Sequence, residues 1–169
     1  MAHATPDRRL RRPGICTEYA AFTFYRKEKL SLRTLITVPV LAFYLSFVAT
    51  ITIIARIPSH SAQYRLMLFW SYKAIAEGDT GLINEVFWNV VLFIPIGILL
   101  MILFTNRFRI ITALGCGLLM SVCIEVVQLV FHRGLFEFDD MVHNTLGTLI
   151  GIGIFLFVTT VGKRLSGKI

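Results

Sequence analysis

Residues 35–55 read LITVPVLAFYLSFVATITIIA, a run of 21 residues without a charged side chain. A helix rises about 1.5 Å per residue, so a run of this length covers the roughly 30 Å hydrocarbon core of a bilayer. A cleaved signal peptide is the rival interpretation, but its apolar core usually has about 7–15 residues. Because this run is longer and follows a long basic tail, we expect a membrane-spanning helix.

Three more apolar segments follow, at residues 86–104, 110–131 and 141–161. The whole chain of 169 residues is 56% hydrophobic and only 16% charged, which lies outside the range of soluble globular proteins. We therefore predict an all-α, polytopic membrane bundle with four transmembrane helices over residues 34–161.

The distribution of charge predicts the orientation of this bundle. If the basic tail (1–33) and the short tail (162–169) are cytoplasmic, 13 of the 17 lysine and arginine residues lie on that side, as the positive-inside rule requires. The opposite side then holds six of the ten acidic residues. The net charge of +7 is not accompanied by a nucleic-acid-binding motif, so we expect the basic tail to face anionic lipid and no nucleic acid to bind.

The long segment 57–85 is predicted to be an interfacial outer loop. It contains Phe69-Trp70-Ser71-Tyr72, and aromatic side chains favour the headgroup level of a bilayer. This group is either an anchor, which we favour, or a contact surface for a lipid-like partner. The three cysteines, Cys16, Cys116 and Cys123, fit no disulfide framework or metal motif, and we expect free thiols.

Polar side chains recur at helical spacing within the last three spans. On the third span, Ser121, Glu125, Gln128 and His132 share one face. An ionisable residue at membrane depth costs about 2.5–3.5 kcal/mol on insertion scales, so Glu125 should face the bundle. The candidate polar cluster near the outer face consists of Asn89, Glu125, Gln128, Asp139, Asp140 and Asn144. The alternative is that these groups only cross-link the helices by hydrogen bonds.

Small and apolar residues near this cluster are expected to be structural. Pro95 and Gly97 should kink or thin the second helix, with Phe93 on the same face as Gly97. Gly147 and Gly151 favour close helix packing over approach of a ligand.

The acidic pair Asp139-Asp140 opens the fourth helix, where one carboxylate can cap free backbone amides. His132 and His143 lie near these acids, and such groups suit divalent ions. No zinc motif is present, however, so we expect no metal and no cofactor.

Three blocks carry a resemblance to a known family: NVVLFIPIG at 89–97, IEVVQ at 124–128 and DDMVHNTLG at 139–147. In this order and spacing they resemble the VanZ-like family of bacterial membrane proteins, over roughly residues 35–161. The matching positions are Asn89, Phe93, Pro95, Gly97, Glu125, Gln128, Asp140, Asn144 and Gly147. The resemblance implies a multi-pass protein of the bacterial cytoplasmic membrane, linked to resistance to teicoplanin, a glycopeptide antibiotic that bears an acyl chain. No enzymatic activity is established for that family.

Three functions remain open at this point. We favour a protein that binds or shields a lipid-linked cell-wall precursor or a lipoglycopeptide at the outer leaflet, in contact with membrane lipids. The second is a membrane-embedded enzyme that uses Glu125, Asp140 and His143, although no nucleophile elbow, phosphate loop or zinc signature supports catalysis. The third, a transporter or channel subunit, is weak for four short spans without an inverted repeat. The residues favour no particular oligomeric state.

Overall fold

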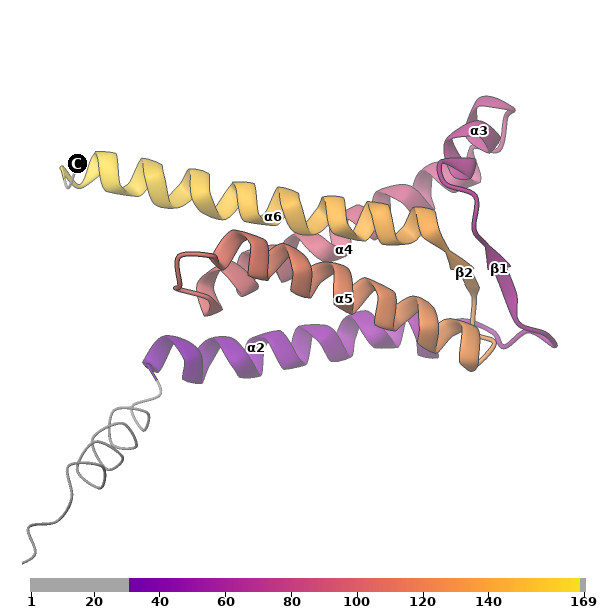
Figure 1. The fold of residues 1–169 in the computed structure, drawn as a ribbon, viewed down its shortest axis with the longest axis horizontal. Coiled ribbons are helices and arrows are strands. Elements are labelled where there is room, and N and C mark those ends of the chain that lie inside the picture. The colour runs from indigo at the N-terminus through magenta and orange to yellow at the C-terminus, as the bar shows by residue number, and fades with distance from the viewer. Residues whose placement is uncertain (1–30, 168–169) are drawn as a thin grey trace, which may run out of the picture. The chain divides into compact units, whose positions relative to one another are not determined.

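A computed structural model of the chain describes residues 31–167. Its long helices are α2 (Leu32–Ala49), continued by the π-helix η1 (Thr50–Ile54), then α4 (Gly81–Leu103), α5 (Arg109–Val130) and α6 (Phe138–Leu165). All four are long and apolar enough to cross a membrane, and they lie alongside one another (Figure 1). The predicted helical membrane architecture is confirmed. The expected basic tail lies almost wholly outside the described residues, as does Cys16.

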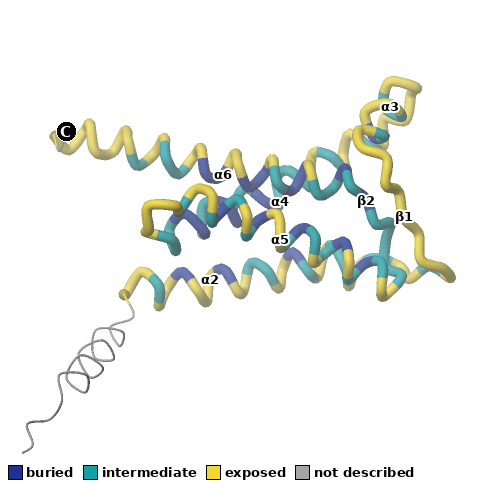
Figure 2. Tube along the Cα trace, in the orientation of Figure 1, coloured by how far each residue is buried: buried dark blue, intermediate teal, exposed yellow. Residues whose placement is uncertain are grey.

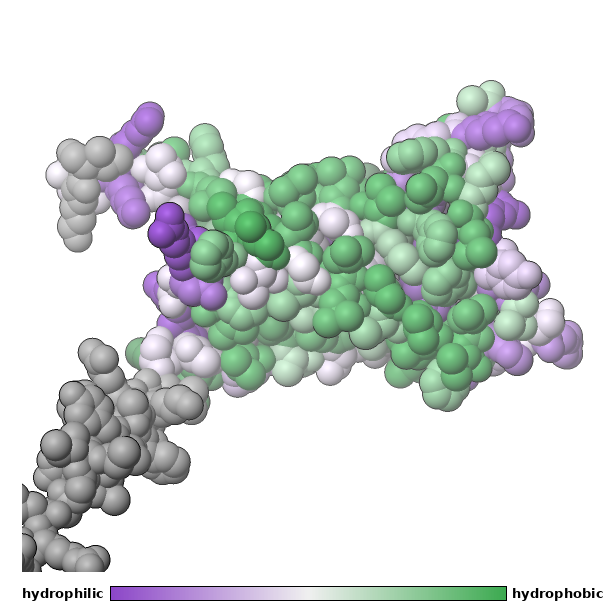
Figure 3. Space-filling view, in the orientation of Figure 1, coloured by the Kyte–Doolittle hydropathy of each residue, from purple (hydrophilic) through white to green (hydrophobic). Residues whose placement is uncertain are grey.

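Large apolar side chains cover the outside of the bundle. Phe43 on α2, Ile111 on α5 and Phe157 on α6 are 78%, 73% and 70% exposed. Figure 3 shows a broad apolar band between two polar ends, and Figure 2 shows that most buried positions of the four long helices lie where these helices face one another. Such a surface would be costly in water but is suited to lipid.

Two helices extend further than the apolar segments predict. Helix α4 begins at Gly81 instead of residue 86, and α6 covers Phe138–Leu165 instead of 141–161. Their extra turns carry polar side chains, including Lys163 and Arg164, which interact favourably with the C-terminal end of the α6 dipole. Hydropathy therefore finds the part of each helix in the hydrocarbon core and misses the turns beyond it.

Glycines bring α4 and α6 into backbone contact. A Cβ atom on Gly147 would overlap the Val90 carbonyl oxygen, and one on Gly151 would overlap the Ile94 carbonyl oxygen. Because the obstructing atoms belong to the backbone, they cannot move aside by changing a rotamer. Next to these contacts, Phe93 is 1% exposed and is part of the apolar core.

Non-helical structure is concentrated at one end of the bundle. Strand β1 (Gln63–Arg65) pairs in parallel with β2 (Leu135–Glu137), and the short helix α3 (Trp70–Ala76) follows β1 (Figure 1). We call this the strand end. The α4–α5 turn and the C-terminal end of α6 lie at the opposite end, which we call the turn end (Figure 1). Strands of three residues are too short for alternating hydrophobicity to predict them.

Candidate functional site

Glu125 is buried inside the bundle near the strand end. It lies on the last third of α5 and is only 1% exposed. Its Oε2 accepts a hydrogen bond of 2.9 Å from the backbone amide of Glu137, in β2. One carboxylate oxygen is thus used to position the strand that precedes α6.

Asp140 and Arg56 lie near this acid, and Asn89 lies beside Asp140. The Asn89 side chain on α4 lies next to the Asp140 carboxyl group on α6. Arg56, just after η1, is close enough for its charge to act on both Asp140 and Glu125. Among residues 31–167, the ion-pair distance of 4 Å is met by Lys73 and Glu77 alone, so Arg56 and Asp140 are not directly paired.

Gln128 binds the end of the first span. Its Nε2 donates a hydrogen bond of 2.8 Å to the Thr52 carbonyl oxygen, and Arg133 donates one of 2.9 Å to the Ile54 carbonyl oxygen. The last carbonyl groups of a helix lack partners within it, so these side chains satisfy them. The Oε1 atom of Gln128 is buried and accepts no hydrogen bond from a described residue.

Asn144 cross-links two helices deeper in the bundle. Its Nδ2 donates a hydrogen bond of 2.9 Å to the Ser121 hydroxyl group on α5, and both side chains are buried. For Asn144 and Gln128, therefore, the structure shows the helix-linking role that the sequence left open.

Asp139 holds α3 instead of joining Asp140 and Glu125. Its carboxylate accepts hydrogen bonds from the backbone amides of Phe69 and Ser71, and from the Ser71 hydroxyl group at 2.6 Å. The N-cap residue of α6, Glu137, makes no side-chain hydrogen bond to a free amide of that helix among the described residues. Asp139 does not cap its own helix, which the sequence left as a possibility, because its carboxylate points away from that helix terminus and toward the first turn of α3.

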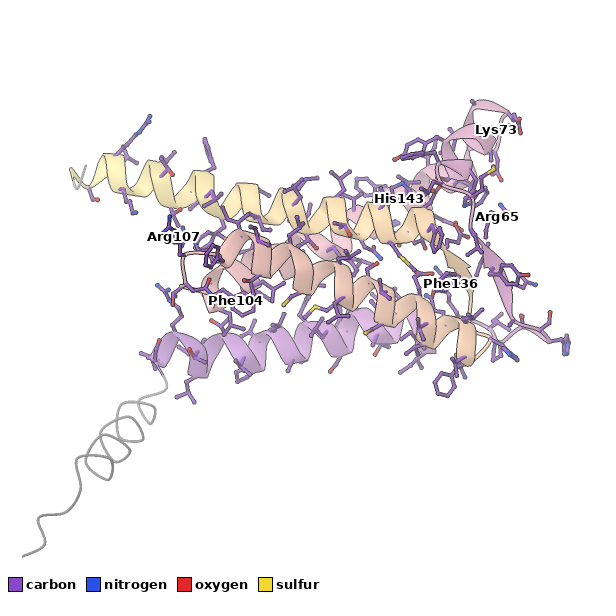
Figure 4. The ribbon with its side chains drawn as sticks, viewed as in Figure 1. Arg65, Lys73, Phe104, Arg107, Phe136 and His143 are labelled. Carbon is purple, nitrogen blue, oxygen red and sulfur yellow. The ribbon has the colours of Figure 1, made fainter. Side chains whose placement is uncertain are left out.

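His143 is directed toward α3 as well. It is 1% exposed, its Nε2 shares a hydrogen bond of 2.9 Å with the Tyr72 hydroxyl group, and the two rings meet edge to face at 5.5 Å. Figure 4 places His143 at the strand end, on the side where α3 carries Lys73. The acidic charge that acts on His143 is that of Asp139. The structure thus separates Asp139 and His143 from Glu125 and Asp140, residues that the sequence grouped together.

These buried polar residues fall within the region that comparison with known proteins identifies. The family model of VanZ/LLP1 matches residues 35–159. The chain belongs to the VanZ/LLP1 family. It is similar to Protein VanZ of Enterococcus faecium, with 30% identity over 98 residues that cover 55% of this chain and 60% of the relative. The chain thus matches less than two thirds of that relative's length. No solved structure matches it. The resemblance based on the three sequence blocks is confirmed.

Glu137 is a residue of this VanZ/LLP1 chain that sequence reasoning missed. It is 7% exposed, and the Trp70 indole donates a hydrogen bond of 3.1 Å to its Oε2. Burial, reinforced by the nearby charge of Asp140, raises the pKa of Glu137 from 4.5 to about 7. The Arg65 guanidinium group stacks over the Trp70 ring at 3.7 Å, so the aromatic segment is bound to β1 and β2.

Arg56 was also missed, because nothing in its local sequence distinguishes it from the other basic residues outside the membrane. Its proximity to the acids arises from the contact between η1 and α5, which sequence spacing does not reveal. In this VanZ/LLP1 chain the candidate site is therefore the group formed by Arg56, Asn89, Glu125 and Asp140 at the strand end.

Proposed function

We propose that this VanZ-like protein lies in the bacterial cytoplasmic membrane with both termini in the cytoplasm and the strand end facing outward. The positive-inside pattern supports this orientation. The turn end holds Arg107, Arg109, Lys163 and Arg164. Figure 4 shows Arg107 and Phe104 at the end opposite Arg65 and Lys73.

We further propose that the strand end binds or shields a lipid-linked cell-wall precursor or a lipoglycopeptide, and that this links the protein to teicoplanin-type resistance. One observation carries the proposal: Arg56 and Asp140, of opposite charge, lie near buried Glu125 without forming an ion pair. Helix cross-linking accounts for Asn144 and Gln128, and one oxygen of Glu125 holds the β2 amide of Glu137. These contacts give Arg56 and Asp140 no structural use. Ionisable groups in a membrane bundle are costly and usually mark a binding or transport site.

Exposed aromatic side chains at the same end of the bundle suit an amphiphilic partner. Phe69 and Tyr72 are 58% and 47% exposed, and their ring centroids are 6.1 Å apart. Asp139 fixes this segment, so its rings present a rigid apolar surface at the level of the headgroups. Rigid aromatics lose little conformational entropy when they bind a ligand. The enzyme alternative is less favoured, because His143 pairs with Tyr72 and not with Glu125 or Asp140.

Antibiotic susceptibility tests this function. A susceptible host expresses the wild type, Glu125→Gln, Asp140→Asn or the control Asp79→Asn at matched membrane levels, and is exposed to teicoplanin and to vancomycin. We expect the wild type and the control to raise the inhibitory concentration of teicoplanin, and the two site variants to lose most of that protection. Equal protection by all four proteins would refute a role for the site, and no protection by any would refute the link to teicoplanin.

A further inference from the structure

An amphipathic groove opens between the end of the first span and the start of α4. Its volume is about 190 Å³. Ile51 and Leu92 form apolar parts of its wall, while Arg56, Glu85 and Asn89 supply its polar groups. The groove thus combines an apolar lining with charges of both signs.

The groove begins at the π-helix η1, which ends the first span and contributes Ile51 and Thr52 to the lining. In η1 the Ala55 amide donates to the Thr50 carbonyl oxygen, five residues earlier, at 2.8 Å. Such π-helical turns often occur at functional sites. Below the groove, the Tyr44 hydroxyl group donates a hydrogen bond of 2.9 Å to the Leu92 carbonyl oxygen and joins α2 to α4.

The groove is lined by one cation, Arg56, and one acid, Glu85. Arg56 is the cation on the wall, and no described carboxylate lies within ion-pair distance of it. Glu85 lies on the facing wall, close enough for its charge to act on Asp140 behind it. A ligand with only a negative charge would pair with Arg56 but would be repelled by Glu85 and Asp140. A ligand with only a positive charge would be attracted by these two acids but repelled by Arg56.

We propose that this groove binds the headgroup of an aminophospholipid, with the phosphate on Arg56 and the primary ammonium group directed to Glu85. A zwitterionic headgroup of this kind matches both signs of charge, and guanidinium groups bind phosphate oxygens with two parallel hydrogen bonds. One acyl chain would lie along Ile51 and Leu92. Arg56 follows the first span by two residues and Glu85 lies in the second turn of α4, which places both at headgroup depth. The inference rests on the proposed function, because it names the lipid class at the same end of the bundle.

Lipid binding by the purified full-length chain in detergent tests the inference. Phosphatidylethanolamine, phosphatidylcholine and phosphatidylglycerol are titrated separately, and binding is followed by the rise in thermal midpoint. We expect phosphatidylethanolamine to bind several-fold more tightly than the other two, because phosphatidylcholine has no ammonium N–H donor and phosphatidylglycerol has no cation. Arg56→Gln should weaken binding of all three by roughly tenfold, and Glu85→Gln should abolish the preference for phosphatidylethanolamine.

Two exposed residues at the same end provide matched controls. Lys73 and Glu77 form a solvent-exposed pair outside the groove, so Lys73→Gln and Glu77→Gln repeat each change of charge elsewhere. Both controls should keep the preference for phosphatidylethanolamine, and Arg56→Lys should restore part of the affinity lost in Arg56→Gln. Equal binding of the three headgroups, preference for phosphatidylglycerol, or equal losses in the controls would overturn the inference.

The lipid and antibiotic experiments can refute the two proposals independently of each other. If the wild type shows no headgroup preference while Asp140→Asn still loses teicoplanin protection, only the aminophospholipid inference is refuted. If the preference holds and protection does not depend on Glu125 or Asp140, the proposed function is refuted and the lipid site remains.

Discussion

At the scale of single residues, Glu137 makes stability depend on pH. Its pKa rises from 4.5 to about 7 on folding, mainly because the side chain is buried. Between these values the folded chain holds a proton that the unfolded chain has lost, so the free energy of unfolding falls as pH rises through this window. The Glu137 contribution is complete below pH 4.5 and lost above about 7, and it amounts to about 1–3 kcal/mol.

Unfolding of the wild type and of Glu137→Gln in detergent, from pH 4 to 8, measures this effect. The difference in stability between the two proteins should change across the window and level off on either side. Glu77→Gln is the control, because this carboxyl group is 67% exposed. If the difference in stability between the wild type and Glu137→Gln does not vary with pH, the raised pKa of Glu137 would be contradicted.

Asp139 offers a second prediction at the residue scale. Oδ1 of Asp139 accepts from the Phe69 amide, and Oδ2 accepts from the Ser71 amide. Replacement by Asn turns one of these two oxygens into a donor, so α3 should detach more readily, at a cost of about 1–3 kcal/mol. Hydrogen exchange over residues 69–76 should then accelerate while exchange in α4 stays slow. Asp79→Asn is the comparison, since that exposed side chain accepts only from the nearby Gly81 amide. Unchanged exchange in Asp139→Asn would show that other contacts hold α3.

At the scale of elements, close approach of α4 and α6 predicts a sharp difference among glycines. Gly151→Ala places a methyl group against the Ile94 carbonyl oxygen and should destabilise the protein by about 1–3 kcal/mol. Gly153→Ala, on the same helix, meets nothing within 4 Å and should be neutral or stabilise by up to about 1 kcal/mol. Thermal unfolding of both variants measures the contrast. Similar midpoints would mean that the helices are further apart than described.

The helices and strands also show which parts of the structure can be predicted from the sequence. Hydropathy locates all four spanning helices, because the bilayer fixes both their length and their composition. Periodicity places Glu125 and Gln128 on the inner face of α5. It does not predict that Asp139 and His143 would face α3, because that contact joins residues about 70 positions apart. Arg56 and Glu137 were missed for the same reason, since only the folded chain brings them to the acids.

At the scale of the whole molecule, the proposed orientation predicts which end is accessible from outside the cell. With Cys16, Cys116 and Cys123 replaced by alanine, Ser59→Cys at the strand end and Thr105→Cys at the turn end each provide one thiol. A membrane-impermeant maleimide should label the first in intact cells and the second only after permeabilisation. The reverse labelling pattern would show that the topology is inverted. A ligand in the outer leaflet would then be excluded from the proposed function.

The parallel pair of β1 and β2 also has a consequence for biogenesis. Tyr64 meets Phe136, so the register joins segments 72 residues apart, with two complete spans between them. During synthesis β1 is released long before its partner exists, and it can pair only after α4 and α5 have been threaded through the bilayer. The strand pair consequently closes only after α4 and α5 are in place, and its closure reports that both helices have been inserted in the correct direction.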